Sequence, residues 1–207
     1  MNIMVETKSA NCTHLAAPRI IRTQKFIIAV AHGAVFLSTE FVDKCLESTK
    51  RPYTEKYLLN DKQGEQQLGS TLPEIRVRAL ANNRQLLKGY HMFCTESNFD
   101  IYKAICEANG GKCLLFRGQR SQQLAIKPLC SEARDPEIED ENVERDAIVY
   151  LVSGVEAEDK KLWPKFNSMV LEAKKVPRVV KNDWLTNALL RQKVDWADEY
   201  QQEGSSV

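Results

Sequence analysis

The stretch CTHLAAPRIIRTQKF, residues 12–26, decides the fold that we predict for the first part of the chain. It has the pattern of a short buried strand, a turn marked by proline and the first turn of an apolar helix. Two cations, Arg22 and Lys25, fall at that first turn. Because the N-terminal end of a helix carries a partial positive charge, cations there are unfavourable unless an anion lies beside them. The stretch therefore predicts an anion-binding site.

The residues after this stretch predict a strand–helix–strand–helix unit. Apolar residues recur at helical spacing from Phe26 to Ala31, and Gly33 provides a helix end. Residues 34–37 then predict a second buried strand. Residues 38–39, Ser and Thr, can cap a further helix. The apolar face of that helix consists of Phe41, Val42, Cys45 and Leu46.

A second copy of this unit is predicted near the end of the chain. Residues 148–153 and 178–180 have the pattern of strands, residues 160–174 have helical character, and Asn182 caps a final helix. Placing Phe41 on Trp184 aligns further apolar positions at the same spacing of 143 residues. The aligned positions are Phe36-Leu37 with Val179-Val180, and Leu46 with Leu189.

The segment between the copies predicts a linker helix, a strand, a helix and another strand. In that order, these elements are expected at residues 72–87, 87–95, 99–108 and 112–116. The fold class is therefore α/β, with two small parallel sheets that have helices on both faces. Residues 135–146 are mostly acidic and predict a solvated loop, while residues 2–6 can form one short strand.

Composition and spacing exclude several classes of function. A net charge of +1 over 207 residues gives no general reason to expect nonspecific nucleic-acid binding. The six cysteines are scattered without a C-x-x-C pair, so we expect reduced thiols, no metal and no cofactor. The three histidines lack the spacing of a catalytic triad, and no phosphate-binding glycine loop occurs, so we expect no enzyme. Without a membrane span or signal peptide, the chain is expected in the nucleus or cytosol.

Motifs spread over nearly the whole length resemble a tandem BRCT pair. They are the strand at residues 13–15, the run Arg22-Thr23-Gln24-Lys25-Phe26, Gly33, Phe41, the Gly110-Gly111 pair and Trp184. The likeness is to the C-terminal pairs of fungal DNA-damage scaffold proteins and of the mediator of DNA damage checkpoint, which read a phosphorylated histone tail. The resemblance implies two repeats, each a small parallel four-stranded sheet flanked by helices. The first, N-terminally truncated, is expected at residues 1–50, a linker with a helix at 51–86 and the second repeat at 87–200.

The resemblance also implies roles for three residues. In this family the pattern R-T-x-K marks pairs that bind phosphorylated peptides. Lys25 and Thr23 would then form the phosphate site, with Thr23 better suited to capping the helix. Arg22 would bind the peptide backbone or a C-terminal carboxylate, because a guanidinium matches a planar carboxylate. The implied function is a nuclear adaptor of the DNA damage response that docks on a phosphorylated C-terminal Ser-Gln histone tail at damaged chromatin.

Two departures from the family pattern concern the phosphate site. The residues before Thr13 cannot hold the opening strand and helix, and in the family that strand supplies a hydroxyl and a backbone N–H to the phosphate. We therefore expect this sequence to be a fragment whose complete protein is the competent reader. Residues 159–165 of the second repeat, DKKLWPK, lack the phosphate signature, and we expect that repeat to brace the first one.

Other interpretations stay open at this point. A phosphate-independent scaffold would bind a protein partner through an apolar surface between the repeats. Direct DNA binding would use Arg117, Arg120 and Lys127, although basic loops of this kind are usually solvated. Five apolar residues could line a peptide groove, but we expect most of them in the core or in inter-repeat packing: Phe26, Ile27, Val30, Phe99 and Trp184.

Overall fold

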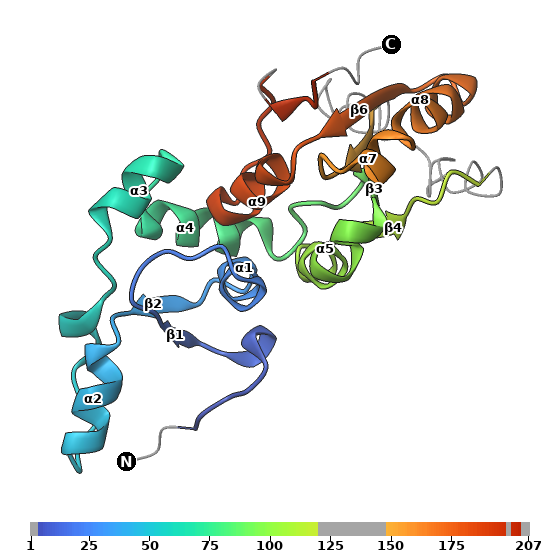
Figure 1. The fold of residues 1–207 in the computed structure, drawn as a ribbon. Coiled ribbons are helices and arrows are strands. Elements are labelled where there is room, and N and C mark those ends of the chain that lie inside the picture. Colours follow the sequence, from blue (N-terminus) through green and yellow to red (C-terminus); the bar gives the residue numbers. More distant parts are fainter. Residues whose placement is uncertain (1–3, 120–147, 198–199, 204–207) are drawn as a thin grey trace. The chain divides into compact units, whose positions relative to one another are not determined.

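The computed structural model describes residues 4–119, 148–197 and 200–203, which fold into two compact units (Figure 1). The first unit comprises residues 1–86 together with 186–194, and the second comprises residues 87–185 together with 195–207. The predicted linker, residues 51–86, is thus packed into the first unit. The predicted acidic loop at 135–146 lies outside the described residues.

The first unit contains a parallel pair of short strands and several helices. Its elements are the 3-10 helix η1 (Ser9–Asn11), β1 (His14–Ala16), α1 (Gln24–Ala31), β2 (Val35–Leu37), α2 (Glu40–Glu47), the 3-10 helix η2 (Thr54–Tyr57), α3 (Lys62–Leu68), α4 (Leu72–Asn82) and the last part of α9 (Asn182–Arg191). Strands β1 and β2 are parallel, with Leu15 opposite Phe36 and Ala16 opposite Leu37. The strand–helix–strand–helix order predicted around residues 12–47 is confirmed.

Helix α1 is fixed at both ends by the residues that predicted its limits. Thr23 is the N-cap, and its hydroxyl accepts a hydrogen bond from the Phe26 N–H at 3.4 Å. At the other end Gly33 has a positive φ of 66°, which glycine adopts without the strain that a side chain would cause. Between these ends Phe26, Ile27 and Val30 are buried, and the Phe26 ring stacks on Phe36 at 4.5 Å. These side chains form core, not a peptide groove.

The predicted linker helix packs beside α1 and ends earlier than expected. A capping box between Thr71 and Glu74 starts α4. Its end at Asn82, several residues before the predicted limit, is followed by Asn83 in a left-handed conformation. The Arg76 Nε donates a hydrogen bond to the Gly33 carbonyl at 3.0 Å, which connects α4 to the turn after α1.

The second unit has a four-stranded parallel sheet. Its elements are β3 (His91–Cys94), α5 (Glu96–Ala108), β4 (Lys112–Leu115), β5 (Ile148–Val152), α7 (Ala157–Lys160), α8 (Trp163–Glu172), β6 (Val176–Val180) and the first part of α9. The strand order is β4-β3-β5-β6, so β5 is paired on both edges, and all five of its residues are buried. The α/β class with parallel sheets flanked by helices is confirmed, but the sheet of the first unit has two described strands and not the four expected for each repeat.

The structure differs from the predicted elements in three places. The helix expected at 160–174 is divided into α7 and α8, and Pro164 lies in the first turn of α8, where a missing N–H is tolerated. Residues 4–6 form no strand, and Asn2 and Ile3 lie outside the described residues. On α2 the predicted apolar face is not buried as a whole, because Leu46 is 83% exposed whereas Leu189, its partner in the repeat, is fully buried.

Candidate functional site

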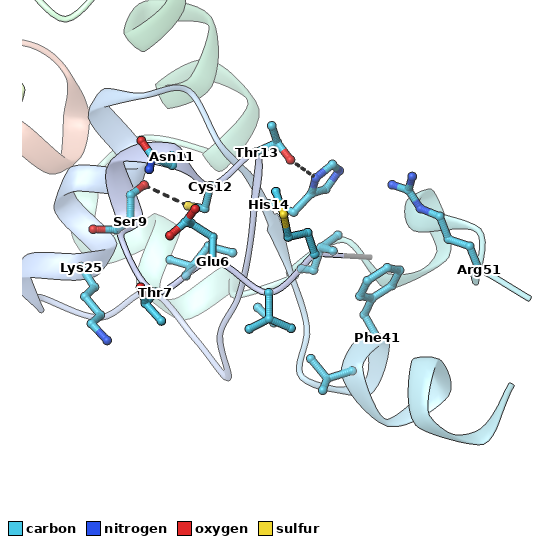
Figure 2. Close-up of a pocket in the computed structure, with 16 residues that line it drawn as sticks. Glu6, Thr7, Ser9, Asn11, Cys12, Thr13, His14, Lys25, Phe41 and Arg51 are labelled. Carbon is cyan, nitrogen blue, oxygen red and sulfur yellow. Dashed lines mark hydrogen bonds between the residues drawn. The ribbon is translucent and has the colours of Figure 1, made fainter. Parts of the chain in front are cut away.

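A cavity of about 550 Å³ opens in the first unit beside β1 and the start of α1 (Figure 2). Its wall combines the segment before β1, one edge of the sheet, helix α2 and the segment after it. The lining residues are Met4, Val5, Glu6, Thr7, Ser9, Asn11, Cys12, Thr13, His14, Leu15, Ala16, Lys25, Leu37, Phe41, Val42 and Arg51. Hydroxyl, thiol, amide and charged groups thus share the cavity with an apolar wall.

Lys25 is the predicted site residue that lies in this cavity. It is the second residue of α1, its side chain is exposed, and the first turn of the helix contains no acidic residue. Within residues 4–119, 148–197 and 200–203, no carboxylate forms an ion pair with the Lys25 ammonium. The ammonium therefore adds an uncompensated charge to the positive end of the helix dipole, which favours an anion in the cavity.

Thr23 and Arg22 are placed differently from Lys25. The Thr23 hydroxyl caps α1 through the hydrogen bond from the Phe26 N–H. Arg22 is exposed and precedes the helix, and neither residue is among those that line the cavity. The structure therefore brings Lys25 to the cavity without Thr23 or Arg22, and the ligand roles implied for these three residues stay predictions.

Arg51 and Glu6 are two charged residues of the cavity that sequence reasoning missed. Figure 2 shows Lys25 on one side of the cavity and Arg51 on the other. Arg51 lies in the polar segment after α2, and no sequence periodicity connects it with Lys25. Glu6 also faces the cavity, and a hydrogen bond from the Lys8 N–H at 3.0 Å lowers the pKa of its carboxyl. The cavity therefore contains two cations and one carboxylate.

His14 contributes a neutral ring to the same wall. Partial burial lowers the pKa of His14, and the nearby guanidinium groups of Arg51 and Arg76 lower it further. Its Nδ1 lies 2.9 Å from the Thr13 hydroxyl. At neutral pH the ring is uncharged, so the positive charge of the cavity comes from its lysine and arginine.

Strand β1 lines the cavity along its whole length, through His14, Leu15 and Ala16. Strand β1 pairs with β2, and no other strand among the described residues pairs with its second edge. In the second unit β5 precedes a helix and a strand in the same order, and it is paired on both sides. The polar groups that face the cavity beside Lys25 belong to Thr7, Ser9 and Asn11 of the segment before β1.

In the second unit the Asp159 carboxylate accepts hydrogen bonds from donor groups that lie near the ends of β3 and β5. Asp159 is buried, and its carboxylate accepts a hydrogen bond from the Ser97 hydroxyl at 2.7 Å and from the Gly154 N–H at 3.2 Å. The neighbouring Lys161 forms an ion pair with Glu158 at 2.6 Å. Because an internal carboxylate already satisfies these donors, this region is poorly suited to an external anion.

The other interactions considered are those with DNA, with metal ions and with membranes. Arg117, which was considered for DNA binding, forms an exposed ion pair with Glu96 at 3.4 Å, whereas Arg120 and Lys127 lie outside the described residues. In the described part of the chain no three His, Cys, Asp or Glu residues are arranged to hold a metal ion. No helix in that part is long and apolar enough to cross a membrane.

Comparison with known proteins finds similarity to a BRCT domain family and to proteins named for BRCT domains or for the DNA damage checkpoint. Residues 1–59 match the family described as the Regulator of Ty1 transposition protein 107 BRCT domain. BRCT-containing protein 1 of Schizosaccharomyces pombe is 29% identical over 204 residues, which covers 96% of this chain and 22% of that protein. Human mediator of DNA damage checkpoint protein 1 is 30% identical over 87 residues, which covers 42% of this chain and 4% of that protein. The chain thus spans less than a quarter of the length of these relatives.

Solved structures agree with the fold. The BRCT5-BRCT6 domains of S. pombe Brc1 superpose with a TM-score of 0.69 at 28% identity, covering 94% of this chain and 86% of that one. The structure of Rtt107p in complex with a phosphorylated histone has a TM-score of 0.56 at 14% identity, covering 98% and 81%, and it supports the fold alone. The sequence matches and the fold together show that this chain is similar, over nearly its whole length, to a tandem BRCT pair, and that it resembles the C-terminal pairs of fungal DNA-damage-response scaffold proteins and of the mediator of DNA damage checkpoint.

Proposed function

We propose that this chain is a phosphoserine-peptide-binding adaptor of the DNA damage response. It would read a phosphorylated C-terminal Ser-Gln histone tail at damaged chromatin in the nucleus, and it would hold a larger protein there without catalysing a reaction. The observation that carries the proposal is the Lys25 ammonium, which lies at the start of α1, lines the cavity and has no ion-pair partner among the described residues.

The charge of the cavity supports a phosphorylated ligand. A phosphoserine carries about −1.5 to −2 charges near neutral pH and several acceptor oxygens. Lys25 and Arg51 supply positive charge on two sides of the cavity, and the first turn of α1 adds backbone N–H groups that lack helical partners. We propose that the phosphate binds at Lys25 and that Thr23 acts through its cap, which holds the first turn in place.

Energy considerations indicate that Lys25 cannot act alone. Micromolar affinity corresponds to about 8 kcal/mol, while a hydrogen bond to a charged group contributes roughly 1.5–3 kcal/mol. The peptide must therefore gain further contacts. Within the cavity these can come from Arg51, from hydroxyl groups such as Ser9, and from apolar contact with Phe41. Arg22, outside the cavity, is the proposed contact for the peptide backbone or its terminal carboxylate.

Named relatives support the same class of ligand. The Rtt107p structure with a similar fold was solved with a phosphorylated histone, and the family matched by residues 1–59 is a BRCT domain of that protein. Another relative is named as a mediator of the DNA damage checkpoint. These names motivate the histone ligand and the nuclear location, which we propose for this chain on that basis.

A phosphate-independent scaffold is the second candidate function. The observation in its favour is the exposed apolar side of α2, where Val42 and Leu46 are 45% and 83% exposed. Residues of this kind can dock a protein partner without any contribution from phosphate. The alternative surface between the two repeats stays a prediction from the sequence.

A titration of three peptides separates the two functions. Isothermal calorimetry would compare a peptide ending in phosphoserine-Gln and a free carboxylate, its unphosphorylated twin, and a phosphorylated twin with an amidated C-terminus. The proposal expects measurable heat for the phosphorylated peptide, none for the unphosphorylated one and weaker binding of the amidated one. Equal affinity for the phosphorylated and unphosphorylated peptides would overturn the phospho-reader and favour the scaffold.

A further inference from the structure

Three cysteines from three different elements meet in the second unit. Cys94 ends β3, Cys113 lies in β4, and Cys106 lies on α5, which packs against both strands. The strands are parallel neighbours with Met92 opposite Cys113 and Cys94 opposite Leu115. Because side chains alternate between the faces of a strand, Cys94 and Cys113 project from the same face of the sheet. Neither thiol is needed for the proposed phosphopeptide site, which lies in the first unit.

The two strand thiols are already in contact. The Sγ atoms of Cys94 and Cys113 are 2.6 Å apart, and both side chains are buried. Each is a free thiol in this structure. Formation of a bond between them, about 2.05 Å long in known disulfides, thus needs little movement of the sulfur atoms.

The thiol of Cys113 is the better nucleophile of the group. Hydrogen bonds from the Cys106 and Cys94 thiols lower the pKa of Cys113, whereas those same contacts and burial raise the pKa of Cys94 and Cys106. Since the thiolate is the reactive species, oxidation should begin at Cys113. Among the described strands β4 is at the end of the order, and Cys113 keeps 6% exposure whereas Cys94 and Cys106 keep none.

We propose that Cys94 and Cys113 form an intramolecular disulfide when the chain encounters hydrogen peroxide. The Cys113 sulfur attacks one peroxide oxygen, the O–O bond breaks, and the products are a sulfenic acid and water. The Cys94 sulfur then attacks the sulfenic sulfur, the S–S bond forms, and the S–O bond breaks. The oxygen leaves as a second water after taking the Cys94 proton. Two thiols are thereby oxidised by two electrons, and one peroxide is reduced to two waters.

Mass spectrometry of the wild-type chain tests this site directly, because trypsin places each of the three cysteines in a separate peptide. These peptides are residues 89–103, 104–112 and 113–117, while the cysteines of the first unit fall in residues 9–19 and 45–50. The chain would be treated with limiting hydrogen peroxide, denatured in N-ethylmaleimide and digested. We expect a dithiothreitol-sensitive cross-link between 89–103 and 113–117 that lacks two hydrogen atoms.

Variants identify which thiols react. Cys94→Ala should abolish this cross-link and leave a Cys113 sulfenic acid that dimedone traps, whereas Cys106→Ala is the matched control and should retain the cross-link. Since the wild-type result does not depend on any variant folding, it decides the proposal alone. A wild-type cross-link between 104–112 and 113–117 would overturn it. The proposal would also be overturned if N-ethylmaleimide alkylates both Cys94 and Cys113 at a peroxide dose that has already oxidised Cys12 or Cys45.

A second readout concerns stability. The disulfide would join adjacent strands and close residues 95–112 into a loop, which restricts the unfolded chain. Peroxide-treated wild-type protein should therefore unfold at a higher temperature than the untreated protein, and dithiothreitol should reverse the shift. The Cys94→Ala variant should show no such shift, and an equal shift in that variant would contradict the assigned pair.

Discussion

Replacing Lys25 by alanine should change phosphopeptide affinity and protein stability in opposite directions. Lys25 is an exposed cation in the first turn of α1, where it opposes the helix dipole. Its removal should therefore stabilise the unliganded protein by about 0.3–1 kcal/mol. The same change should weaken binding of a phosphorylated peptide, because the cavity loses the charge that faces the phosphate.

The size of the affinity loss follows from the exposure of Lys25. A hydrogen bond to a charged group contributes about 1.5–3 kcal/mol when water is excluded, but an exposed ion pair contributes only about 0.2–1 kcal/mol. Lys25 is exposed, yet it lines a cavity in which the peptide would displace water. We therefore expect the lower end of the first range, about 1.5 kcal/mol, which is roughly a tenfold rise in Kd.

Lys62 provides a matched control for this substitution. It is also exposed and in the first turn of a helix of the first unit, α3, but it does not line the cavity. Calorimetry would compare wild type, Lys25→Ala, Lys25→Arg and Lys62→Ala with the phosphorylated and unphosphorylated peptides, and urea unfolding would give the stability of each variant.

Among the four proteins, the largest loss of affinity for the phosphorylated peptide is expected for Lys25→Ala. Lys62→Ala should bind like the wild type, and Lys25→Arg should retain most of the affinity because it keeps the charge. The reasoning is refuted if Lys25→Ala and Lys62→Ala bind the phosphorylated peptide equally well. It is also refuted if Lys25→Ala loses affinity for both peptides by the same factor, since that loss could not come from the phosphate.

Three further predictions concern the first unit. Thr23→Ala should reduce the free energy of unfolding by about 0.5–2 kcal/mol through loss of the cap of α1, and Thr23→Asn should restore it; an unaltered urea midpoint for the alanine variant would contradict the capping role. Gly33→Ala should cost at least about 1–2 kcal/mol, because φ is 66° and a Cβ would meet the Leu80 Cδ2 at 2.7 Å; unchanged thermal unfolding would argue against this turn. Burial lowers the pKa of His14 and His32 below the ordinary 6.5, so the unfolded chain binds more protons and stability should fall as pH drops below about 6.5. Replacing both histidines by glutamine should flatten urea midpoints between about pH 7.5 and pH 5, and an unchanged slope would rule out these groups.

The strands and helices of the second unit could be predicted from the sequence because local patterns of apolar residues indicate which segments are buried. Residues 148–152 are a continuous apolar run, and in the structure β5 is buried along its whole length between two neighbours. The repeat spacing also placed Trp184 correctly, since its side chain is 1% exposed. Long apolar runs specify a buried strand because few other structures remove so much apolar surface from water.

The same repeat was less informative at Leu46. The alignment pairs Leu46 with Leu189, but Leu46 is exposed and Leu189 is buried. The apolar spacing of α2 does not show which other elements pack against it. The Cys94–Cys113 contact was equally inaccessible, because strand register and not sequence spacing brings these thiols together. Burial of one position depends on the elements packed against it, and that information is distributed over distant parts of the chain.

For the candidate site, the sequence located the helix start and its cation but not the surrounding cavity. The Arg22–Phe26 run predicted a cap and an uncompensated charge, both of which are local properties of a helix N-terminus. The cavity also requires Glu6 and β1 together with Arg51, which lies far from both in sequence. Only folding of the chain back on itself could bring them to one place.

The sequence by itself determined the α/β class, the repeated unit and the position of Lys25 at a helix start, because hydrophobic periodicity and helix capping act over a few residues. The tertiary structure decided which apolar faces are covered, which charged groups share the cavity and which thiols touch. Those properties depend on strand register and helix packing between segments distant in sequence, and local patterns do not encode these distances.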